Sequence, residues 1–272
     1  MPSPETTEHT DLDGRNLAAS KQFVKFRPWL KASATVEQGN RRPTMEDRIC
    51  ISKFSYKTKT FFIFLLLDGH GGAQVADFAS QHFPAIMSRE VVRQHGHHIR
   101  QVIKQTFVEV NRLVSHFPSG STASLLLAIE DKKKATQRPD VWVANVGDST
   151  IFGLDHQSGA RKLSVDHNVK MKSEQDRILR EGSLTIVEGY VCTPMGHMLA
   201  VTRALGDADF GPVVTAEPHI VHVKHAYPVF VLASDGIWDV MNGKEVWQKL
   251  QPPKERRAWR ESAYRLNHWR NT

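Results

Sequence analysis

Three apolar segments of this sequence run directly into an aspartate that has a glycine beside it. The segments and their aspartates are 61–67 with Asp68, 141–146 with Asp148, and 229–233 with Asp235. A single Asp-Gly pair after a strand is most often only a turn. Three such pairs after buried strands can gather carboxylates at one edge of a fold, where glycine lets the backbone approach closely.

Carboxylates brought together in this way need a positive partner. At a separation of about 4 Å and an effective dielectric constant of about 20, each pair costs roughly 4 kcal/mol in repulsion. The sequence has only two cysteines, Cys50 and Cys192, and no HExxH histidine pair. The available ligands are therefore hard oxygens, which select Mg²⁺ or Mn²⁺ over Zn²⁺ or Cu²⁺.

Charged residues near these aspartates suit phosphate chemistry. Residues 41–48, RRPTMEDR, supply Arg42, Glu46 and Asp47. A guanidinium can bind two phosphate oxygens as a fork, and His70 could protonate a leaving oxygen, because histidine exchanges protons near neutral pH. Alone, Arg42 reads as a solvated residue and His70 as a structural one, so only their joint occurrence favours catalysis. Neither cysteine begins a Cys-x5-Arg loop, which excludes the cysteine-dependent route.

Six short motifs follow one another along the chain. They are RRPTMED at 41–47, LDGHGG at 67–72, SGSTAS at 119–124, VANVGDS at 143–149, LAVTRALGD at 199–207 and ASDGIWDV at 233–240. In this order they resemble the metal-dependent serine/threonine protein phosphatases of the 2C type (the PPM family), over about residues 32–246. One such motif would be weak, whereas six in the family's order are highly specific.

The resemblance implies a fold, an activity and a set of residue roles. The fold is α+β, a central sandwich of two antiparallel β-sheets flanked by α-helices in four αββα layers. The activity is hydrolysis of phosphoserine and phosphothreonine in phosphoproteins, with two Mg²⁺ or Mn²⁺ ions and a weaker third. By the resemblance, Asp68 would bridge two metals, and the Gly69 carbonyl and Asp235 would each ligate one. Glu46 and Asp47 would bind a metal or orient its water, and Arg42 would bind the substrate phosphate. Asp148 and Asp239 match the positions of a third metal site.

The chain departs from the family pattern after Asp239. Family members usually continue to an Asp-Asn-x-Thr segment, but the 33 residues that follow (272 − 239) contain no aspartate. We therefore expect a domain truncated at its C-terminus, without the closing strand and the last metal ligand. Either its metal affinity and activity are impaired, or another acid or a water takes the place of the missing ligand. The alternative is a phosphatase-like binding module that recognises partners without hydrolysing them.

Composition and periodicity define the elements that must position these residues. Hydrophobic residues make up 40% and charged residues 24% of the 272, as in soluble globular proteins. We expect a flexible leader over 1–30, a phosphatase domain over 31–250, and a basic tail over 251–272 that is helical or disordered. Strands are predicted at 33–38, 49–54, 60–67, 121–129, 141–146 and 228–234, and helices at 72–89, 98–117 and 171–180.

The remaining features bear on partners and location. The formal charge is +7, but +4 of it lies in 252–272, so binding of DNA or RNA is the weakest reading and no nucleic-acid partner is expected. The sequence shows no signal peptide and no apolar run long enough to span a membrane. Because two cysteines suit a reducing compartment, we expect the cytosol or nucleus. The segment 183–198 is expected to form a lid beside the site, and its sequence does not indicate which substrate is bound.

Overall fold

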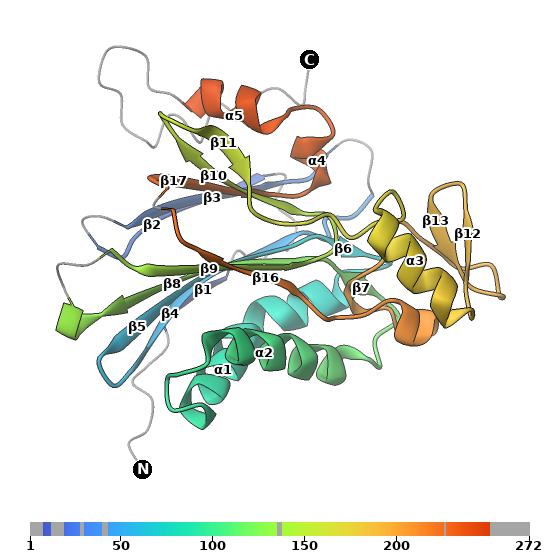
Figure 1. Cartoon of the computed structure of the whole chain (residues 1–272), viewed down its shortest axis with the longest axis horizontal. Coiled ribbons are helices and arrows are strands. Elements are labelled where there is room, and N and C mark those ends of the chain that lie inside the picture. Colours follow the sequence, from blue (N-terminus) through green and yellow to red (C-terminus); the bar gives the residue numbers. More distant parts are fainter. Residues whose placement is uncertain are drawn as a thin grey trace.

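Two layers of antiparallel strands face each other in the computed structural model, and helices cover both outer faces (Figure 1). The structure describes residues 8–11, 19–27, 30–39, 43–134, 138–225 and 227–250. This arrangement confirms the predicted α+β sandwich flanked by helices. Arg42 and the predicted tail over 251–272 lie outside the described residues.

The larger sheet has the strand order β1-β4-β5-β8-β9-β16. Its strands are β1 (Glu8–Asp11), β4 (Arg48–Tyr56), β5 (Lys59–Leu67), β8 (Ala123–Asp131), β9 (Asp140–Val146) and β16 (His219–Val223), each antiparallel to its neighbours. The sequence of β5, KTFFIFLLL, is apolar on both faces because helices cover one face and the second layer covers the other. Phe61, Phe62 and Ile63 at its centre are fully buried.

The second layer consists of one three-stranded sheet and one hairpin. The sheet contains β10 (Thr150–Asp155), β11 (Gly159–Lys162) and β17 (Val229–Ala233) in the order β11-β10-β17, and the hairpin pairs β2 (Ala19–Lys25) with β3 (Lys31–Glu37). The sequence predicts a flexible leader over 1–30, but β1 and β2 lie in this range and pair with β4 and β3. The mixed polar sequence of β2, ASKQFVK, gave no strand signal of its own.

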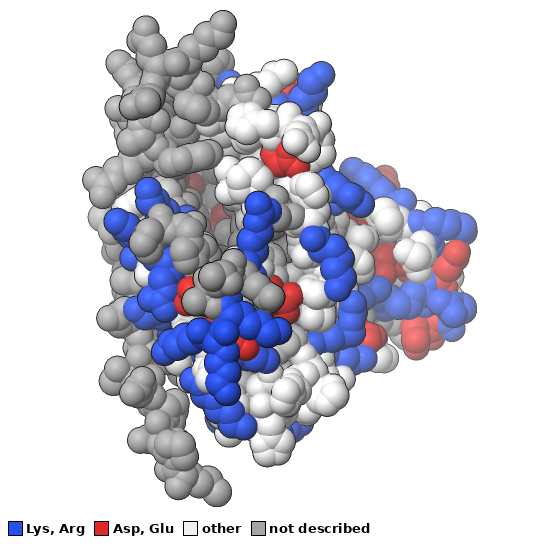
Figure 2. Space-filling model, turned by 60° about the vertical axis from the view of Figure 1, so that its left-hand side comes forward, with Lys and Arg blue, Asp and Glu red and all other residues white. Residues whose placement is uncertain are grey.

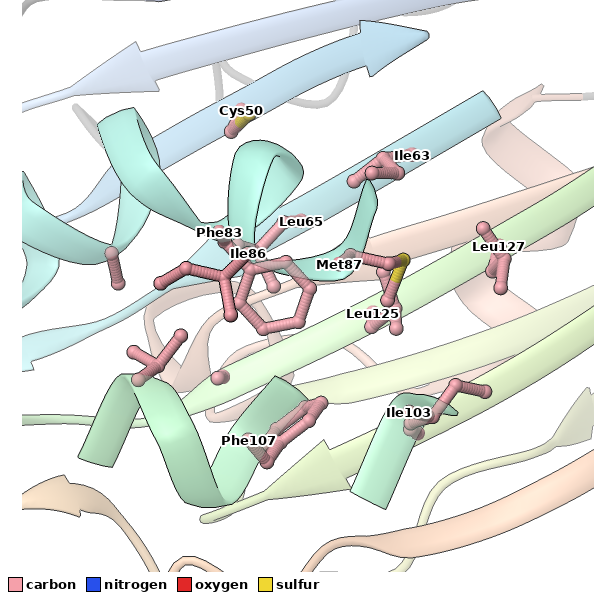
Figure 3. Close-up of a cluster of buried hydrophobic side chains, with 14 of the residues drawn as sticks. Cys50, Ile63, Leu65, Phe83, Ile86, Met87, Ile103, Phe107, Leu125 and Leu127 are labelled. Carbon is pink, nitrogen blue, oxygen red and sulfur yellow. The ribbon is translucent and has the colours of Figure 1, made fainter. Parts of the chain in front are cut away.

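Helices α1 (Gln74–Arg93) and α2 (Ile99–Val114) pack on the outer face of the larger sheet. Figure 3 shows where their side chains meet those of the sheet, and its labelled residues include Phe83, Ile86 and Met87 of α1, Ile103 and Phe107 of α2, Ile63 and Leu65 of β5, and Leu125 and Leu127 of β8. Each large side chain buried here contributes about 1.5–3 kcal/mol. This core therefore holds β5 firmly, and the end of β5 leads into Asp68.

Two short helices cover the second layer. They are α4 (Asp235–Trp238) and α5 (Gly243–Leu250), and α5 buries Val246 and Trp247 in a cluster with Leu154 of β10. Gly243 is needed at the start of α5, because a Cβ there would collide with the ring of Phe152. None of the described helices is long and apolar enough to cross a membrane.

A smaller unit packs at one end of the sandwich, on the right in Figure 1. It contains α3 (Lys172–Glu181), β12 (Thr185–Val187), β13 (Tyr190–Cys192), β14 (Met198–Leu199) and the 3₁₀ segment η2 (Ala208–Val213). Buried Glu174 of α3 ties the unit together by accepting hydrogen bonds from Arg177 (2.8 Å), Arg203 (2.6 Å) and Thr202 (2.8 Å). The predicted lid over 183–198 falls within this unit.

Candidate active site

Four aspartates reach the same end of the sandwich from four separate segments. Asp47 precedes β4, Asp68 follows β5, Asp148 follows β9, and Asp235 begins α4 directly after β17. Each lies at or just beyond a strand end, where the sequence predicts Asp68, Asp148 and Asp235. The fold thus gathers residues that are up to 188 positions apart (235 − 47).

Strand register explains why these aspartates meet. The first residue of β4 pairs with the last residue of β5, so Asp47 and Asp68, just outside these ends, are neighbours. The first residue of β10 pairs with the last residue of β17, so Asp148 and Asp235 are neighbours as well. Main-chain hydrogen bonding therefore brings together side chains that repel one another.

Burial and the repulsion between carboxylates raise the pKa values of two of these residues, Asp68 and Asp148. Burial raises the pKa of Asp68 to about 9, and the charges of Asp47, Asp235 and Asp148 add to the rise. Burial, followed by the charge of Asp235, raises the pKa of Asp148 to about 6. Without a cation, Asp68 is therefore protonated at neutral pH, and it hydrogen-bonds Asp47.

The four acids offer oxygen ligands only. Among the residues that the structure describes, no group of three or more His, Cys, Asp and Glu side chains is placed so that it could hold a metal ion. Instead, Asp68 and Asp47 share a hydrogen bond that needs a proton between two carboxyl groups. That proton relieves the same repulsion that a cation would relieve. Carboxylate oxygens in this number suit Mg²⁺ or Mn²⁺.

Hydroxyl groups brace the loops that carry the four acids. The Asp68 N–H donates to Thr122 Oγ1 at 3.2 Å, and the Thr122 N–H donates to the Asp68 carbonyl at 2.9 Å. Thr122 Oγ1 also lies 2.9 Å from Oγ of Ser149, next to Asp148. Ser234 Oγ donates to Asp47 Oδ2 at 3.2 Å. The SGSTAS motif therefore supports the acids rather than supplying one.

The segment before β4 is fixed by an arginine that is buried. Arg48 Nε contacts Asp77 Oδ1 of α1 at 2.6 Å, and Arg48 Nη1 donates to the carbonyls of Met45 (3.0 Å) and Asp47 (2.9 Å). Arg48 thus orients the turn that bears Glu46 and Asp47. This structural role distinguishes it from Arg42, which precedes the described part of the motif.

Gly69 sits where a larger residue could not. A Cβ on Gly69 would lie 2.6 Å from the carbonyl oxygen of Glu46, so only glycine lets the two segments approach. The Glu46 carboxylate accepts a hydrogen bond from Thr44 Oγ1 at 3.2 Å. Asp239 is exposed at the C-terminal end of α4, where its N–H donates to the Asp235 carbonyl at 2.8 Å.

A small three-stranded sheet positions His70 beside the acids. Its strands are β6 (Gly69–His70), β7 (Gly120–Ser121) and β15 (Leu205–Gly206), in the order β15-β7-β6. His70 Nε2 lies 2.8 Å from Oδ2 of Asp207, a carboxylate that is almost fully buried. Both side chains pass over Gly120, and a Cβ there would collide with each of them.

Asp207 was not singled out from the sequence, although it closes the LAVTRALGD motif. Its partner His70 is 137 positions away, and the pairing is made by two-residue strands that have no periodic signature. Asp166 was missed in the same way. It accepts a hydrogen bond from Thr150 Oγ1 at 3.1 Å and contributes to the raised pKa of Asp148.

Comparisons with known proteins agree on one family. The sequence model of the protein phosphatase 2C family matches residues 32–252. A protein kinase and PP2C-like domain-containing protein of Arabidopsis thaliana is 34% identical over 76% of this chain and 32% of its own length. Probable protein phosphatase 2C 56 of Oryza sativa subsp. japonica is 30% identical over 82% of this chain and 65% of its own length. The chain thus spans from about a third to about two thirds of these relatives.

Solved structures share the fold. Serine-threonine phosphatase 2C from Toxoplasma gondii superposes with a TM-score of 0.59 at 19% identity, covering 90% of this chain and 87% of that one. A C. elegans sex determining protein gives a TM-score of 0.63 at 21% identity, covering 85% of this chain and 55% of that one. At these identities the likeness extends to the fold alone.

Proposed function

The chain belongs to the protein phosphatase 2C family, and from this premise we propose that it hydrolyses phosphoserine and phosphothreonine in phosphoproteins with two bound Mg²⁺ or Mn²⁺ ions. The observation that carries the proposal is the meeting of four aspartates at one end of the sandwich, where Asp47, Asp148 and Asp235 surround the half-buried carboxyl group of Asp68. A cluster of this charge is stable only with a positive partner.

Each acid has a proposed role in holding the cations. Asp68 would bridge the two ions, the Gly69 carbonyl and Asp235 would each ligate one, and Glu46 and Asp47 would bind metal or orient its water. When bound, the ions supply positive charge that activates the attacking water and neutralises the phosphoryl group. Asp148 and Asp239 are the candidates for a weaker third ion, and Arg42 for binding the substrate phosphate.

His70 is the proposed general acid for the leaving serine or threonine oxygen. Its Nε2 is engaged by the Asp207 carboxylate at 2.8 Å, so Nδ1 is the nitrogen that would deliver a proton. A carboxylate beside a histidine fixes the tautomer and orientation of the ring. Asp207 therefore acts as a positioning residue, not as a metal ligand.

The test is phosphate release from a phosphoserine peptide. We expect turnover with Mn²⁺, loss of turnover with EDTA, and at least about a 100-fold decrease for Asp68→Asn and Asp235→Asn. Asp176→Asn on α3, an exposed acid with Lys172 as its partner, is the matched control and should keep full activity. Turnover indifferent to EDTA would refute the metal mechanism. Saturable peptide binding without turnover would favour the binding-module alternative.

A location in the cytosol or nucleus remains part of the proposal. It rests on the two cysteines, Cys50 and Cys192, both of which are buried thiols that form no disulfide. Buried thiols of this kind persist in a reducing compartment without forming disulfides. Cell fractionation of the tagged full-length chain would decide the question.

A further inference from the structure

An apolar cavity of about 560 Å³ lies between the two layers of the sandwich. It is lined by β3 and β17 on one side and by Ile51, Phe64 and Leu126 of the larger sheet on the other. Interdigitating side chains ordinarily fill the interior of a sandwich. A space of this size falls instead within the roughly 300–1,000 Å³ of sites that bind small molecules.

The space exists because β3 carries short side chains on its inner face. At the start of β3 the exposed Lys31 and Ser33 alternate with the half-buried Ala32 and Ala34, and Val36 farther along the same face is buried. Within the part of the chain that the structure describes, β3 pairs with β2 and β17 pairs with β10, but β3 and β17 do not pair with each other. The cavity therefore follows the gap between these two strands along the sandwich.

The two ends of the cavity differ in charge. At the candidate active site its lining includes Glu37, Asp47 and Ser234. At the opposite end its lining includes Lys31, at the start of β3, and Pro228, just before β17. An anionic group is therefore repelled from the first end and attracted to the second.

The turns around the second end are strongly basic. These basic turns, residues 56–59, 130–134, 138–140 and 223–225, hold seven Lys or Arg against three Asp or Glu. They adjoin one another, since the Lys132 N–H donates to the Thr58 carbonyl at 2.8 Å and Val223 pairs with Val141. Figure 2 brings this end forward and shows Lys and Arg crowded over it.

The hairpin that carries Lys31 belongs to the same surface. Arg27, in the β2–β3 turn, contacts Glu130 at 3.0 Å, two residues before the exposed run Lys132, Lys133 and Lys134. Lys25 pairs with Lys31 across the hairpin. The cationic surface is therefore continuous with the cavity lining at Lys31.

We infer that this chain binds a long-chain fatty acid, with the acyl chain in the cavity and the carboxylate at Lys31 beside the basic turns. The acyl chain needs only apolar walls, which the cavity supplies along its length. The single negative group needs a cation at one end and none at the other, which matches the charges of the two ends. The site is separate from the proposed phosphatase reaction, although it reaches the strands that carry Asp47 and Asp235.

The test is calorimetric titration of the full chain with oleate below its micelle concentration. We expect one-to-one saturation by oleate, at least tenfold weaker binding of oleyl alcohol, which lacks the charge, and no saturation by hexanoate, which lacks the chain. Ala34→Trp should fill the cavity and abolish binding, and Lys31→Glu should weaken it at least tenfold. Val108→Trp and Lys170→Glu, at exposed positions elsewhere, are the matched controls and should bind like the parent.

Thermal unfolding of each variant establishes that it is folded, and the exposed Lys31→Glu keeps the test decisive if Ala34→Trp does not fold. Oleate binding unchanged in folded Ala34→Trp and in Lys31→Glu would overturn the assignment, as would equally tight binding of oleyl alcohol. Binding seen only after deletion of residues 251–272 would assign the cavity to the chain's own tail instead. Photolabelling by a diazirine fatty acid should modify peptides from β3 or β17.

Discussion

At the scale of single residues, the pairing of His70 with Asp207 shows most clearly how a catalytic role can be separated from a structural one. The carboxylate holds one ring nitrogen at 2.8 Å and leaves the other for proton transfer to a leaving group. An alkoxide needs that proton, whereas a nitrophenolate leaves without it. The two kinds of substrate should therefore respond differently when the carboxylate is removed.

We expect Asp207→Asn to lower kcat for a phosphoserine peptide by about 10²-fold or more, the usual contribution of general acid catalysis. Hydrolysis of p-nitrophenyl phosphate by the same variant should change much less. Steady-state kinetics on both substrates provide the measurement, with the exposed Asp209→Asn as the matched control. Equal losses on both substrates would show that Asp207 serves only the fold of the site.

Residue types and motif order were enough to predict Asp47, Asp68, Asp148 and Asp235 as neighbours, because strands end where their apolar runs end. They were not enough to predict how the neighbours are held. The side chains of Thr122 and Arg48 act by contacting main-chain groups, and no pattern in the sequence predicts such contacts. The metal-binding roles of the aspartates and the phosphate-binding role of Arg42 stay predictions, and Arg42 lies outside the described residues.

At the scale of elements, the strands that carry the site were predictable and those around it were not. The runs at 61–67 in β5 and 229–233 in β17 are continuously apolar, a pattern typical of strands that are covered on both faces. By contrast, β16 has the sequence HIVHV, and β10 contains Gly153, against which the ring of Tyr227 packs so closely that no Cβ fits. Such tertiary contacts leave no periodic signal. The predicted helices 72–89, 98–117 and 171–180 agree with α1, α2 and α3 to within a few residues.

The element most sensitive to a single substitution is α3, because Glu174 ties it to the segment that carries Thr202 and Arg203. Burial raises the pKa of Glu174, but hydrogen bonds from Arg203 and Arg177 outweigh this and lower the pKa to about 2. Since the folded pKa lies below the unfolded value of about 4.5, the carboxylate stabilises the fold above pH 4.5. That stabilisation is lost as the pH falls from about 4.5 toward 2.

We therefore expect Glu174→Gln to lower the free energy of unfolding by about 3 kcal/mol at pH 7, because the half-buried Arg177 and Arg203 lose their buried partner. The difference from the parent should shrink at pH 3. Urea denaturation at both pH values provides the measurement. Glu109→Gln, which breaks a surface pair with Arg112 on α2, should stay within about 0.5 kcal/mol. A loss for Glu174→Gln that is small, or independent of pH, would contradict this account of the α3 anchor.

At the scale of the whole molecule, the sandwich separates two regions of opposite character. Acids from four segments gather at one end, and Lys and Arg gather on the turns at the other (Figure 2). Antiparallel strands make this separation possible because alternate loops emerge at opposite ends. The fold class followed from the motif order and the grouping of strands and helices. The incomplete packing between β3 and β17 could not be foreseen, because it depends on how two edges face each other.

The central claim is that the acidic end binds divalent cations through Asp68, and calorimetric titration of the metal-free chain with Mn²⁺ tests it most directly. We predict saturable binding of two Mn²⁺ per chain, with release of protons because Asp68 is protonated when no cation is bound. Asp68→Asn should abolish the tight binding, whereas Asp176→Asn should leave it unchanged. Absence of saturable Mn²⁺ binding, or binding that persists in Asp68→Asn, would contradict the account.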